Sequence, residues 1–474
     1  MISGKYKTLG NNTVLVFIGS ASAKVVGLLM LPYYTRWLSM ADYGVSDLIN
    51  VYSTFLLAFV SCCIEAAIFI FPKNKSTKEQ AYYYSSSIVF ITITSLITAI
   101  VFFLITIISP QIGITNAFTQ NIWLIFLLLI SHVYQGVTQQ FTRSINKILV
   151  FSLTGVVITT CTAIFAVMLI PKYHLQGYIW SLILANFCGT LFSLIASKSY
   201  LYISHKNISV AKCKEMLKYS IPLIPNSAMW WLVNSINRPI LERYCSYEEI
   251  GLFAVAQKFP GILTMLFAVF LASWQISVID EYKKEGFHDF SNKVLKVVTI
   301  GSIFILLMIT LCSELLIKIF ATEQYVKGAY LIPILTMGVI FSNLGGLIAT
   351  VFSAVRISKY YFYSSIWAAV VAALSNAILI PFIGITGAAL STMLSMLVMA
   401  IVRLFYSKKF VKWEWSSLYL SLFLFSVLVY IMVMWKVNIV LIIMTIGLVY
   451  GGLIYYNRLQ LKRIFNQLKK GNCS

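Results

Sequence analysis

Long apolar stretches, each interrupted by a short polar or charged segment, run along almost the whole 474-residue chain. A helix that crosses a bilayer needs ~20 mostly apolar residues, and the pattern predicts about fourteen such helices. Because the stretches show no alternation of period two, helices are favoured over the strands of a membrane barrel. The predicted spans are residues 12–36, 43–71, 81–109, 118–142, 148–170, 175–197, 219–242, 249–279, 294–317, 328–354, 360–380, 386–407, 413–435 and 438–456.

The composition excludes an ordinary soluble protein. Apolar residues make up 59% of the chain, charged residues only 11%, and the mean hydropathy is +0.86. A soluble core of ordinary size cannot accommodate so much apolar surface. We therefore expect an all-α, polytopic membrane protein.

The charge distribution orients the predicted helices. The net charge of +21 raises the question of a nucleic-acid partner, but 27 of the 36 lysines and arginines lie on one side of the predicted spans. Six lie on the opposite side and three lie inside spans. Such an excess marks the cytoplasmic side of a membrane protein, so both termini are predicted to be cytoplasmic and nucleic acid is not an expected partner.

Two pairs of segments indicate an internal duplication. "LPYYTRWLSMADYG" (31–44) and "RPILERYCSYEEIG" (238–251) share P-x-x-x-R-x-x-S-x-x-[DE]-x-G at an offset of 207. "LIPKYHLQGYIWS" (169–181) and "LIPFIGITGAALS" (379–391) share L-I-P-x5-G-x3-S at an offset of 210. Nearly equal offsets define a repeat. Each copy contains six spans, an even number, so the two copies are predicted to have parallel topology with the substrate path between them.

The duplication predicts the domain organisation. Two further spans follow the second copy, and a basic tail whose apolar residues share one helical face is expected to lie on the inner leaflet. The predicted units are a six-helix lobe at 1–200, a cytoplasmic connector at 201–217, a second six-helix lobe at 218–408, two additional helices at 409–457 and the amphipathic tail at 458–474.

Polar residues recur on one face of several predicted spans. Such residues inside a bilayer normally face protein or water. The faces of spans one, two, seven and eight therefore predict a central, cationic chamber that would attract a compact anion such as a diphosphate. Close packing of small residues and a structural ion pair are the alternatives. The candidate substrate-binding residues are Ser20, Lys24, Arg36, Ser227, Asn234, Arg238, Arg243 and Lys258.

For three further groups of residues the sequence allows two roles each: the outer arginines, the acidic residues and the prolines. Arg36 and Arg243 lie near the outer interface, where they either touch substrate or anchor the rim. Asp47 and Glu65 either neutralise the chamber cations or couple transport to an ion. The prolines in and beside spans one and seven are either hinges or mere kinks, and they are Pro32, Pro222, Pro225 and Pro239.

Signs of a cofactor, a metal site or an enzyme are absent from the sequence pattern. The eight cysteines have no metal or disulfide spacing, and the chain has no phosphate-binding G-x-x-x-x-G-K-[ST] motif. The longest outer connection, about 318–327, is short for a catalytic loop. His132, inside a span, is expected to be a packed or hydrogen-bonded group. We expect neither an enzyme nor a cofactor.

The segments "NNTVLVFIGSASAKVVGLLMLPYYTRWLSMADYGVSDL" and "LKYSIPLIPNSAMWWLVNSINRPILERYCSYEEIGLFAVAQKFPGIL" resemble the polysaccharide-transport branch of the MOP exporter superfamily, especially the Wzx-type O-antigen flippases. The resemblance implies a V-shaped, two-lobed transporter of undecaprenyl-diphosphate-linked oligosaccharides in the bacterial inner membrane. It implies membrane lipids as surroundings, with a polysaccharide polymerase and a chain-length regulator as candidate partners. Matching positions for the cationic chamber are Lys24, Arg36 and Lys258.

Wzx-type proteins usually have twelve spans, whereas fourteen are predicted here, as in the related peptidoglycan-precursor flippases. In those relatives the extra pair forms a groove for the lipid tail. A multidrug or small-molecule antiporter of the same superfamily is the alternative function, although it would be expected to have an acidic chamber. A membrane polysaccharide polymerase is the third.

Overall fold

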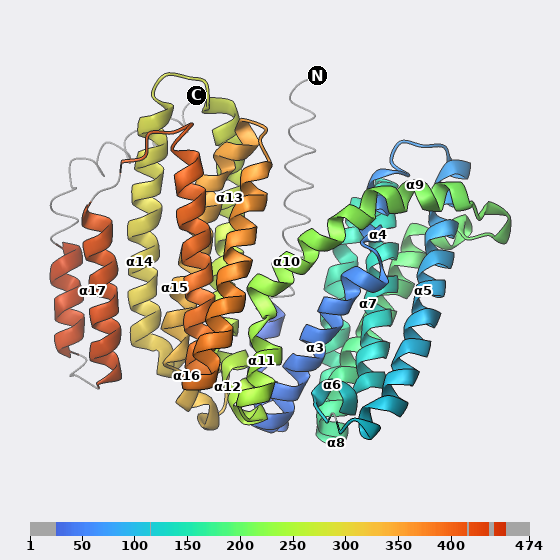
Figure 1. Ribbon diagram of the computed structural model, residues 1–474, viewed down its shortest axis with the longest axis horizontal. Coiled ribbons are helices and arrows are strands. Elements are labelled where there is room, and N and C mark those ends of the chain that lie inside the picture. The colour runs from blue at the N-terminus through green and yellow to red at the C-terminus, as the bar shows by residue number, and fades with distance from the viewer. Residues whose placement is uncertain (1–24, 114, 415–416, 436–439, 452–474) are drawn as a thin grey trace.

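Helices form all the regular structure in the described part of the chain, which the computed structural model gives as residues 25–113, 115–414, 417–435 and 440–451 (Figure 1). The first half contains α2 (Leu31–Trp37), α3 (Met40–Val60), α4 (Ile64–Ile70), α5 (Thr77–Gln111), α6 (Ala117–Gln120), α7 (Ile122–Ser144) and α8 (Ile148–Ser197). The connector contains η1 (Ser199–Tyr202), η2 (His205–Asn207) and α9 (Val210–Ser220).

The second half begins with short helices and ends with long ones. Its elements are η3 (Ile221–Leu223), α10 (Ile224–Ser235), α11 (Asn237–Tyr244), α12 (Tyr247–Ala256), α13 (Lys258–Glu281), α14 (Phe287–Phe320), η4 (Glu323–Gly328), α15 (Leu331–Ala354) and α16 (Lys359–Ser407). The appended apolar helices are α17 (Ser417–Met434) and Val440–Gly451. In the described residues, eight helices are long and apolar enough to cross a membrane, with α12 and α13 taken as one. The predicted tail and most of the first span, including Ser20 and Lys24, lie outside the described residues.

Helices α8 and α16 each contain a kink that divides them into two predicted spans. Non-helical dihedrals occur at His174 in α8 and at Ile383 and Gly384 in α16, between spans 148–170 and 175–197 and between spans 360–380 and 386–407. A Cβ at Gly177 would lie 2.4 Å from the carbonyl oxygen of Leu169, and the equivalent contact, from Gly387 to Leu379, is 2.5 Å. The L-I-P-x5-G repeat therefore marks two helical hairpins that turn so tightly that only glycine fits.

The duplicated segments 31–44 and 238–251 form helix–turn–helix corners that meet each other. Ser39 caps α3 by accepting from the Asp42 amide at 3.0 Å, and Ser246 caps α12 by accepting from the Glu249 amide at 3.2 Å. The shared S-x-x-[DE] is thus a helix N-terminal signal. The shared glycine comes one turn later, where α3 and α12 cross.

The α3–α12 crossing is nearly symmetric. A Cβ at Gly44 would lie 2.0 Å from the Tyr247 carbonyl oxygen, and one at Gly251 would lie 2.2 Å from the Met40 carbonyl oxygen. Met40 and Tyr247 are themselves separated by 207 residues, the offset of the repeat. The halves therefore pack on one another around a local two-fold axis, as parallel repeats do.

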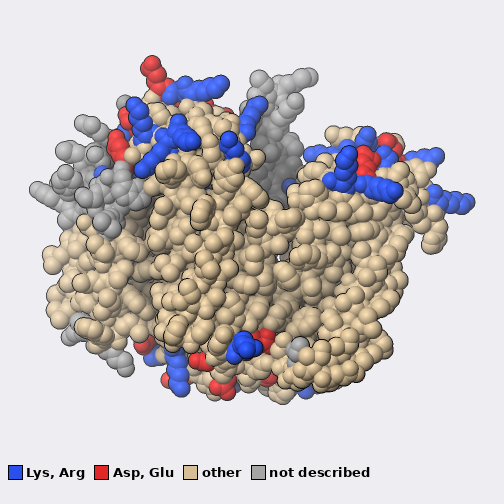
Figure 2. Space-filling model, in the orientation of Figure 1, with Lys and Arg blue, Asp and Glu red and all other residues tan. Residues whose placement is uncertain are grey.

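Two lobes converge at this crossing and separate toward the opposite end (Figure 1). One apolar cluster spans the convergence, because it contains Leu31 and Leu48 of the first half with Phe253 and Leu331 of the second. Lysines and arginines gather at the separated end, where Figure 2 shows a notch between the lobes. This is the end that the positive-inside rule predicts to be cytoplasmic, and the lobes are in contact at the opposite end.

The connector is attached to the first lobe. The hydroxyl of Ser85 donates to the Tyr202 carbonyl oxygen at 2.8 Å, and that of Ser86 donates to the Ser209 carbonyl oxygen at 3.1 Å. Met216 of α9 is fully buried in the first lobe's apolar cluster. Segment 199–220 therefore forms part of the first lobe, and the path to the second lobe runs through η3 and α10.

Candidate functional site

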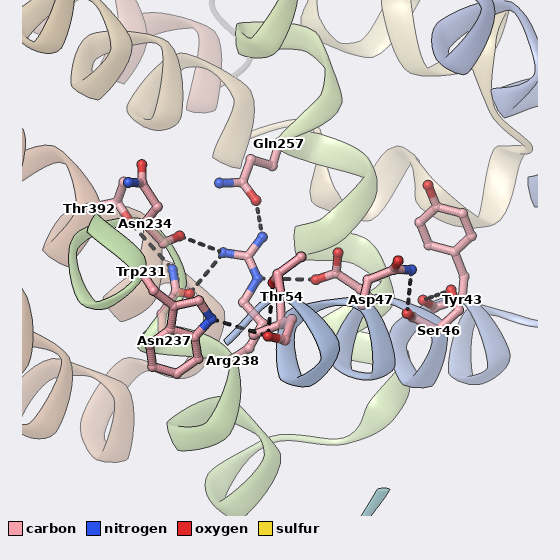
Figure 3. Close-up of polar contacts among 12 residues, drawn as sticks. Tyr43, Ser46, Asp47, Thr54, Trp231, Asn234, Asn237, Arg238, Gln257 and Thr392 are labelled. Carbon is pink, nitrogen blue, oxygen red and sulfur yellow. Dashed lines mark hydrogen bonds and ion pairs between the residues drawn. The ribbon is translucent and has the colours of Figure 1, made fainter. Parts of the chain in front are cut away.

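A polar centre lies at the crossing of the lobes, one turn inside the Gly44–Gly251 contact (Figure 3). Arg238 projects from the start of α11 and is only 4% exposed. Its guanidinium Nε lies 3.1 Å from the Asp47 carboxylate of α3. This ion pair joins the two halves, because the cation belongs to one copy of the repeat and the carboxylate to the other.

Every nitrogen of the Arg238 guanidinium has a partner. Nη1 donates to the Asn237 side chain at 2.8 Å and approaches the Asn234 carbonyl oxygen at 3.5 Å, while Nη2 donates to the Gln257 side chain. The group also lies 4.8 Å from the centre of the Phe253 ring. A buried charge is tolerated only when it is paired and fully hydrogen-bonded. In this conformation Arg238 is a structural link between the halves, with four of its five N–H donors engaged.

Asp47 accordingly neutralises a cation, one of the two roles open to it from the sequence. Its side chain remains about one-fifth exposed. It belongs to the same helix face as Thr54 and Ser61, as the 3,4-spacing predicts.

Glu242 makes a second polar link between the halves, at the outer end of α11. Its carboxylate accepts from the Tyr52 hydroxyl of α3 and from the backbone amide of Ala117, where α6 begins. Tyr247 approaches the same carboxylate at 3.5 Å. Both Glu242 and Arg238 lie on α11, so this short helix carries the charged groups that hold the first lobe.

Lys258 is exposed, in contrast to Arg238. It begins α13, directly after Gln257, the residue that receives the Arg238 Nη2 bond. Gln257 at the α12–α13 junction thus bonds to a buried cation, Arg238 of α11, while the next residue, Lys258, is an exposed cation. Lys258 directly follows α12, the helix whose Gly251 touches the α3 backbone of the first lobe.

Asn234 and Ser227 lie on α10, whose fit against the first lobe is set by Trp231. The Trp231 indole donates to the Val51 carbonyl oxygen at 3.1 Å, and its ring centre lies 4.3 Å from that of Phe55. Asn234 is exposed one turn before Arg238. Ser227 approaches the Cys63 sulfur of the first lobe at 3.6 Å.

Arg36 and Arg243 are exposed, each in the last turn of a short helix, α2 or α11. A cation at a helix C-terminus is favoured by the helix dipole, which agrees with the anchoring interpretation. The structure does not bring these two side chains into the Arg238 centre.

The predicted hinge prolines all lie at helix starts. Pro32 and Pro225 are in the first turns of α2 and α10, Pro222 is within η3, and Pro239 is the third residue of α11. There the missing amide hydrogen bond costs little. The predicted seventh span is therefore divided into η3, α10 and α11, and the junction residues Leu223 and Ile236 keep helical dihedrals, as in a kinked helix.

Glu65 and His132 lie apart from the Arg238 centre, on α4 and α7 in the first lobe. The Glu65 Oε2 and His132 Nδ1 atoms are buried, and neither has a hydrogen-bond partner in the described structure. His132 was expected to be packed or hydrogen-bonded; its Nδ1 atom is buried and has no hydrogen-bond partner among the described residues.

Sequence reasoning missed the residues that bond to Arg238 and the residue that binds Glu242. These are Gln257, Asn237 and Tyr52. Gln257 and Asn237 are polar residues inside predicted spans, and that was the available signal. Tyr52 carried no comparable signal, since tyrosine is common on apolar helix faces.

Residues 9–273 match the protein family described as "Polysaccharide biosynthesis protein". A Staphylococcus aureus protein named "Capsular polysaccharide biosynthesis protein CapF" is 28% identical over 219 residues, which are 45% of this chain and 54% of that protein. The match thus spans about half the length of that curated relative.

Two solved structures show the fold. "Lipid II flippase MurJ, inward closed conformation" is 16% identical, with a TM-score of 0.72 over 94% of this chain and 100% of that chain. A point mutant of the Vibrio cholerae MATE transporter VcmN is 12% identical, with a TM-score of 0.57 over 86% of this chain and 97% of that chain. The all-helical, MOP-type fold predicted from the sequence is confirmed.

Proposed function

This chain belongs to the family of polysaccharide biosynthesis proteins, and we propose that it is a flippase for an undecaprenyl-diphosphate-linked oligosaccharide. It carries the repeat unit of an O-antigen or related surface polysaccharide from the inner to the outer face of the cytoplasmic membrane. A polymerase and a chain-length regulator at the outer face are the partners that this role implies. One observation carries the proposal: the lobes are joined at one end and separated at the cation-rich end (Figure 2). Lys258, which follows the Arg238-bonded Gln257, is exposed.

The charged centre supports alternating access. Opening the outer side requires α3 to separate from α12, which breaks the Arg238–Asp47 pair and the bonds from Tyr52 and Ala117 to Glu242. A buried arginine that loses its carboxylate needs another anion. A diphosphate that enters beside Lys258 supplies one, so substrate replaces Asp47 as the partner of Arg238. The proline-started helices η3 and α10 accommodate the movement.

An apolar groove on the second lobe suits the lipid tail. A cavity of about 330 Å³ lies between α14, α15, α16 and α17, and hydrophobic side chains such as Ile340, Phe341 and Phe423 line it almost entirely. The appended helix α17 supplies one wall. A long isoprenoid chain is expected to lie here while its diphosphate is held between the lobes.

A flipping assay with a matched lysine pair tests the proposal. Proteoliposomes carry either Lys258→Gln or Lys318→Gln, because Lys318 is also exposed but lies in the last turn of α14. Loss of one charge–diphosphate contact of ~1.4 kcal/mol gives about a tenfold slower flipping of fluorescent undecaprenyl-diphosphate oligosaccharide for Lys258→Gln. Lys318→Gln should match the wild type.

Equal rates for both variants would contradict a role for Lys258 in substrate binding. Saturable binding of cationic drugs by the purified protein, with no binding of the diphosphate lipid, would favour the antiporter alternative and refute the flippase.

A further inference from the structure

Arg403 is a buried cation in the second lobe. It lies on the second leg of α16, the part that follows the kink, one turn before the helix ends at Ser407. Only 5% of Arg403 is exposed, whereas the neighbouring Lys408 and Lys409 are exposed. An arginine so close to the end of a membrane helix can usually extend its guanidinium to water. Arg403 is instead held between the two legs of α16, at the end that the positive-inside rule predicts to be cytoplasmic.

The guanidinium of Arg403 has few partners. Its Nε donates to the Ser364 hydroxyl at 3.1 Å, and its carbon lies 5.8 Å from the centre of the Tyr361 ring. Both partners belong to the first leg of α16. In the described part of the chain, neither Nη atom has a hydrogen-bond or ion-pair partner. Since a guanidinium has five N–H donors, four of them are unused.

No carboxylate neutralises this cation within the described helices that pack most closely on α16, which are α10, α11, α12 and α15. The sequence has no aspartate or glutamate between Glu323 and Glu414, and none in α10. The acidic residues of α11 and α12 lie near the kink of α16, where Cys245 contacts Gly384, and so at the other end of the lobe. A buried cation without a carboxylate is disfavoured unless another anion binds it.

The first lobe forms the equivalent hairpin without a cation. At the offset of 210, Arg403 corresponds to Ser193 of α8. Ser364 corresponds to Thr154. Ser193 and Thr154 are both buried, and the Ser193 hydroxyl lies 2.9 Å from the Thr142 hydroxyl of α7. Because neutral hydroxyls are sufficient for packing there, the hairpin itself does not require an arginine.

The surface on either side of Arg403 has the character of a lipid-facing surface. Large exposed apolar side chains adjoin it in sequence on both legs of α16, and they are Phe362, Tyr363, Ile401 and Phe405. Aromatic residues near the ends of membrane helices lie at the level of the lipid head groups. Arg403 therefore lies at the depth of lipid phosphates, between side chains that suit acyl chains.

We infer that Arg403 binds the phosphate of an anionic phospholipid in the leaflet predicted to be cytoplasmic. The two Nη atoms supply the paired donors with which an arginine holds a phosphate, while Ser364 retains the Nε. The exposed Lys359 and Lys408, at the ends of the two legs, attract a negatively charged head group.

This site is separate from the Arg238 centre. Thr392 of α16 is the residue that accepts from Asn237 of that centre. Arg403 follows Thr392 by eleven residues, which corresponds to about 16 Å along the helix. The proposed phospholipid site therefore does not depend on the flippase function.

Native mass spectrometry of the purified full-length protein in neutral detergent tests the site with three lipids. Phosphatidylglycerol has a phosphate and a net negative charge, phosphatidylcholine has a phosphate and no net charge, and diacylglycerol has no phosphate. The wild type should retain phosphatidylglycerol most tightly and diacylglycerol least. Arg403→Gln should weaken retention of phosphatidylglycerol by about tenfold or more. The matched control Lys408→Gln, at an exposed position, should match the wild type, and equal retention by Arg403→Gln and the wild type would overturn the proposal.

A phosphatidylglycerol with a photoreactive head group locates the site in the wild type, so the result does not depend on the folding of Arg403→Gln. Crosslinks should fall within 359–367 and 401–409, and labelling confined to other helices would overturn the site. Excess undecaprenyl diphosphate or inorganic phosphate should leave these crosslinks in place. Displacement by undecaprenyl diphosphate would assign the site to the transported substrate, and displacement by inorganic phosphate would assign it to the free ion; either result would overturn the phospholipid assignment.

Discussion

The two copies of the duplicated corner, 31–44 and 238–251, have the same backbone design and different chemistry. Each has a serine cap and a glycine that touches the other copy's backbone. Arg238 of the second copy pairs with Asp47, whereas the equivalent residues, Leu31 and Ala254, are buried in one apolar cluster. Symmetry in the chain therefore sets where the lobes meet, and the departure from symmetry places charge on one side of the meeting point.

The same asymmetry recurs at the outer link. Glu242 accepts from the Tyr52 hydroxyl, whereas the equivalent residues are Thr35 and Phe259. Thr35 donates to the Leu31 carbonyl oxygen of its own helix at 3.0 Å. One side of the interface is thus held by bonds to the Glu242 carboxylate, and the other by apolar packing with one hydrogen bond from the Thr322 hydroxyl to the Thr35 carbonyl oxygen at 3.3 Å. Packing alone can be remade after a movement, but the charged side requires a replacement partner.

The shared glycines provide the largest expected effect. Gly44→Leu or Gly251→Leu places a Cβ within 2.0 or 2.2 Å of a carbonyl oxygen, so the backbones must separate. Overpacking of this kind costs ~3 kcal/mol or more. Both variants should lose thermal stability in detergent to a similar degree. Gly301→Leu is the control, because nothing lies within 4 Å of that position; wild-type melting of the Gly44 variant would show that the crossing is not tight.

Replacement of Arg238 and Asp47 by the residues at the equivalent positions, Leu31 and Ala254, tests the difference between the two sides directly. Arg238→Leu alone leaves Asp47 unpaired and should destabilise the protein by ~3 kcal/mol, the lower end for a broken buried pair because Asp47 is partly exposed. Arg238→Leu with Asp47→Ala reproduces the Leu31–Ala254 side and should recover most of that loss. A double-mutant cycle on thermal stability measures this. Additive losses would mean that the pair contributes no coupling.

Tyr52→Phe makes the smaller change to the outer link and copies Phe259. It removes one of the bonds to the Glu242 carboxylate but leaves the Ala117 amide bond, so a loss of ~1.5 kcal/mol is expected. Flipping should depend less on this bond than on Lys258. Melting experiments on Tyr52→Phe and Phe259→Tyr compare the two sides; an equal loss in both would remove the asymmetry.

The serine caps provide the smallest expected effect. Ser246 has a complete capping box, because the Glu249 side chain also accepts from the Ser246 amide at 2.9 Å. The Ser39 cap consists of the bond from the Asp42 amide to the Ser39 hydroxyl. An N-cap contributes ~1 kcal/mol. Ser246→Ala should therefore lower the melting temperature slightly more than Ser39→Ala. The reverse order would contradict a stronger cap in the second copy.

Much of the fold was predictable because helices that cross a bilayer need long apolar stretches, and such stretches are visible in the sequence. The all-helical fold follows from the long apolar stretches, and the two hairpins and the paired corners follow from repeated prolines and glycines. The breaks at Cys62–Cys63 and at Gln257 were not predicted, since neither position has a residue that typically ends a helix. Their dihedrals depend on packing against other helices.

The candidate site was predicted less completely. The 3,4-spacing placed Asp47 and Lys258 on polar helix faces, but it did not show that Arg238 bonds to Gln257 and Asn237. Those bonds depend on how α11 packs against α12 and α3. The periodicity of a single helix does not show how that helix packs against its neighbours. Glu65 was predicted as a polar residue, while the absence of a partner for its Oε2 atom depends on how α4 packs against α7.

The tight hairpins of α8 and α16 have a consequence for biogenesis. In each, a glycine meets a carbonyl oxygen only eight residues earlier in the chain. Contacts so close in sequence form quickly, because little loop-closure entropy opposes them. The last two helices of each half are therefore able to enter the bilayer as a preassembled pair. The last hairpin of each repeat can therefore form in the membrane before the two lobes associate.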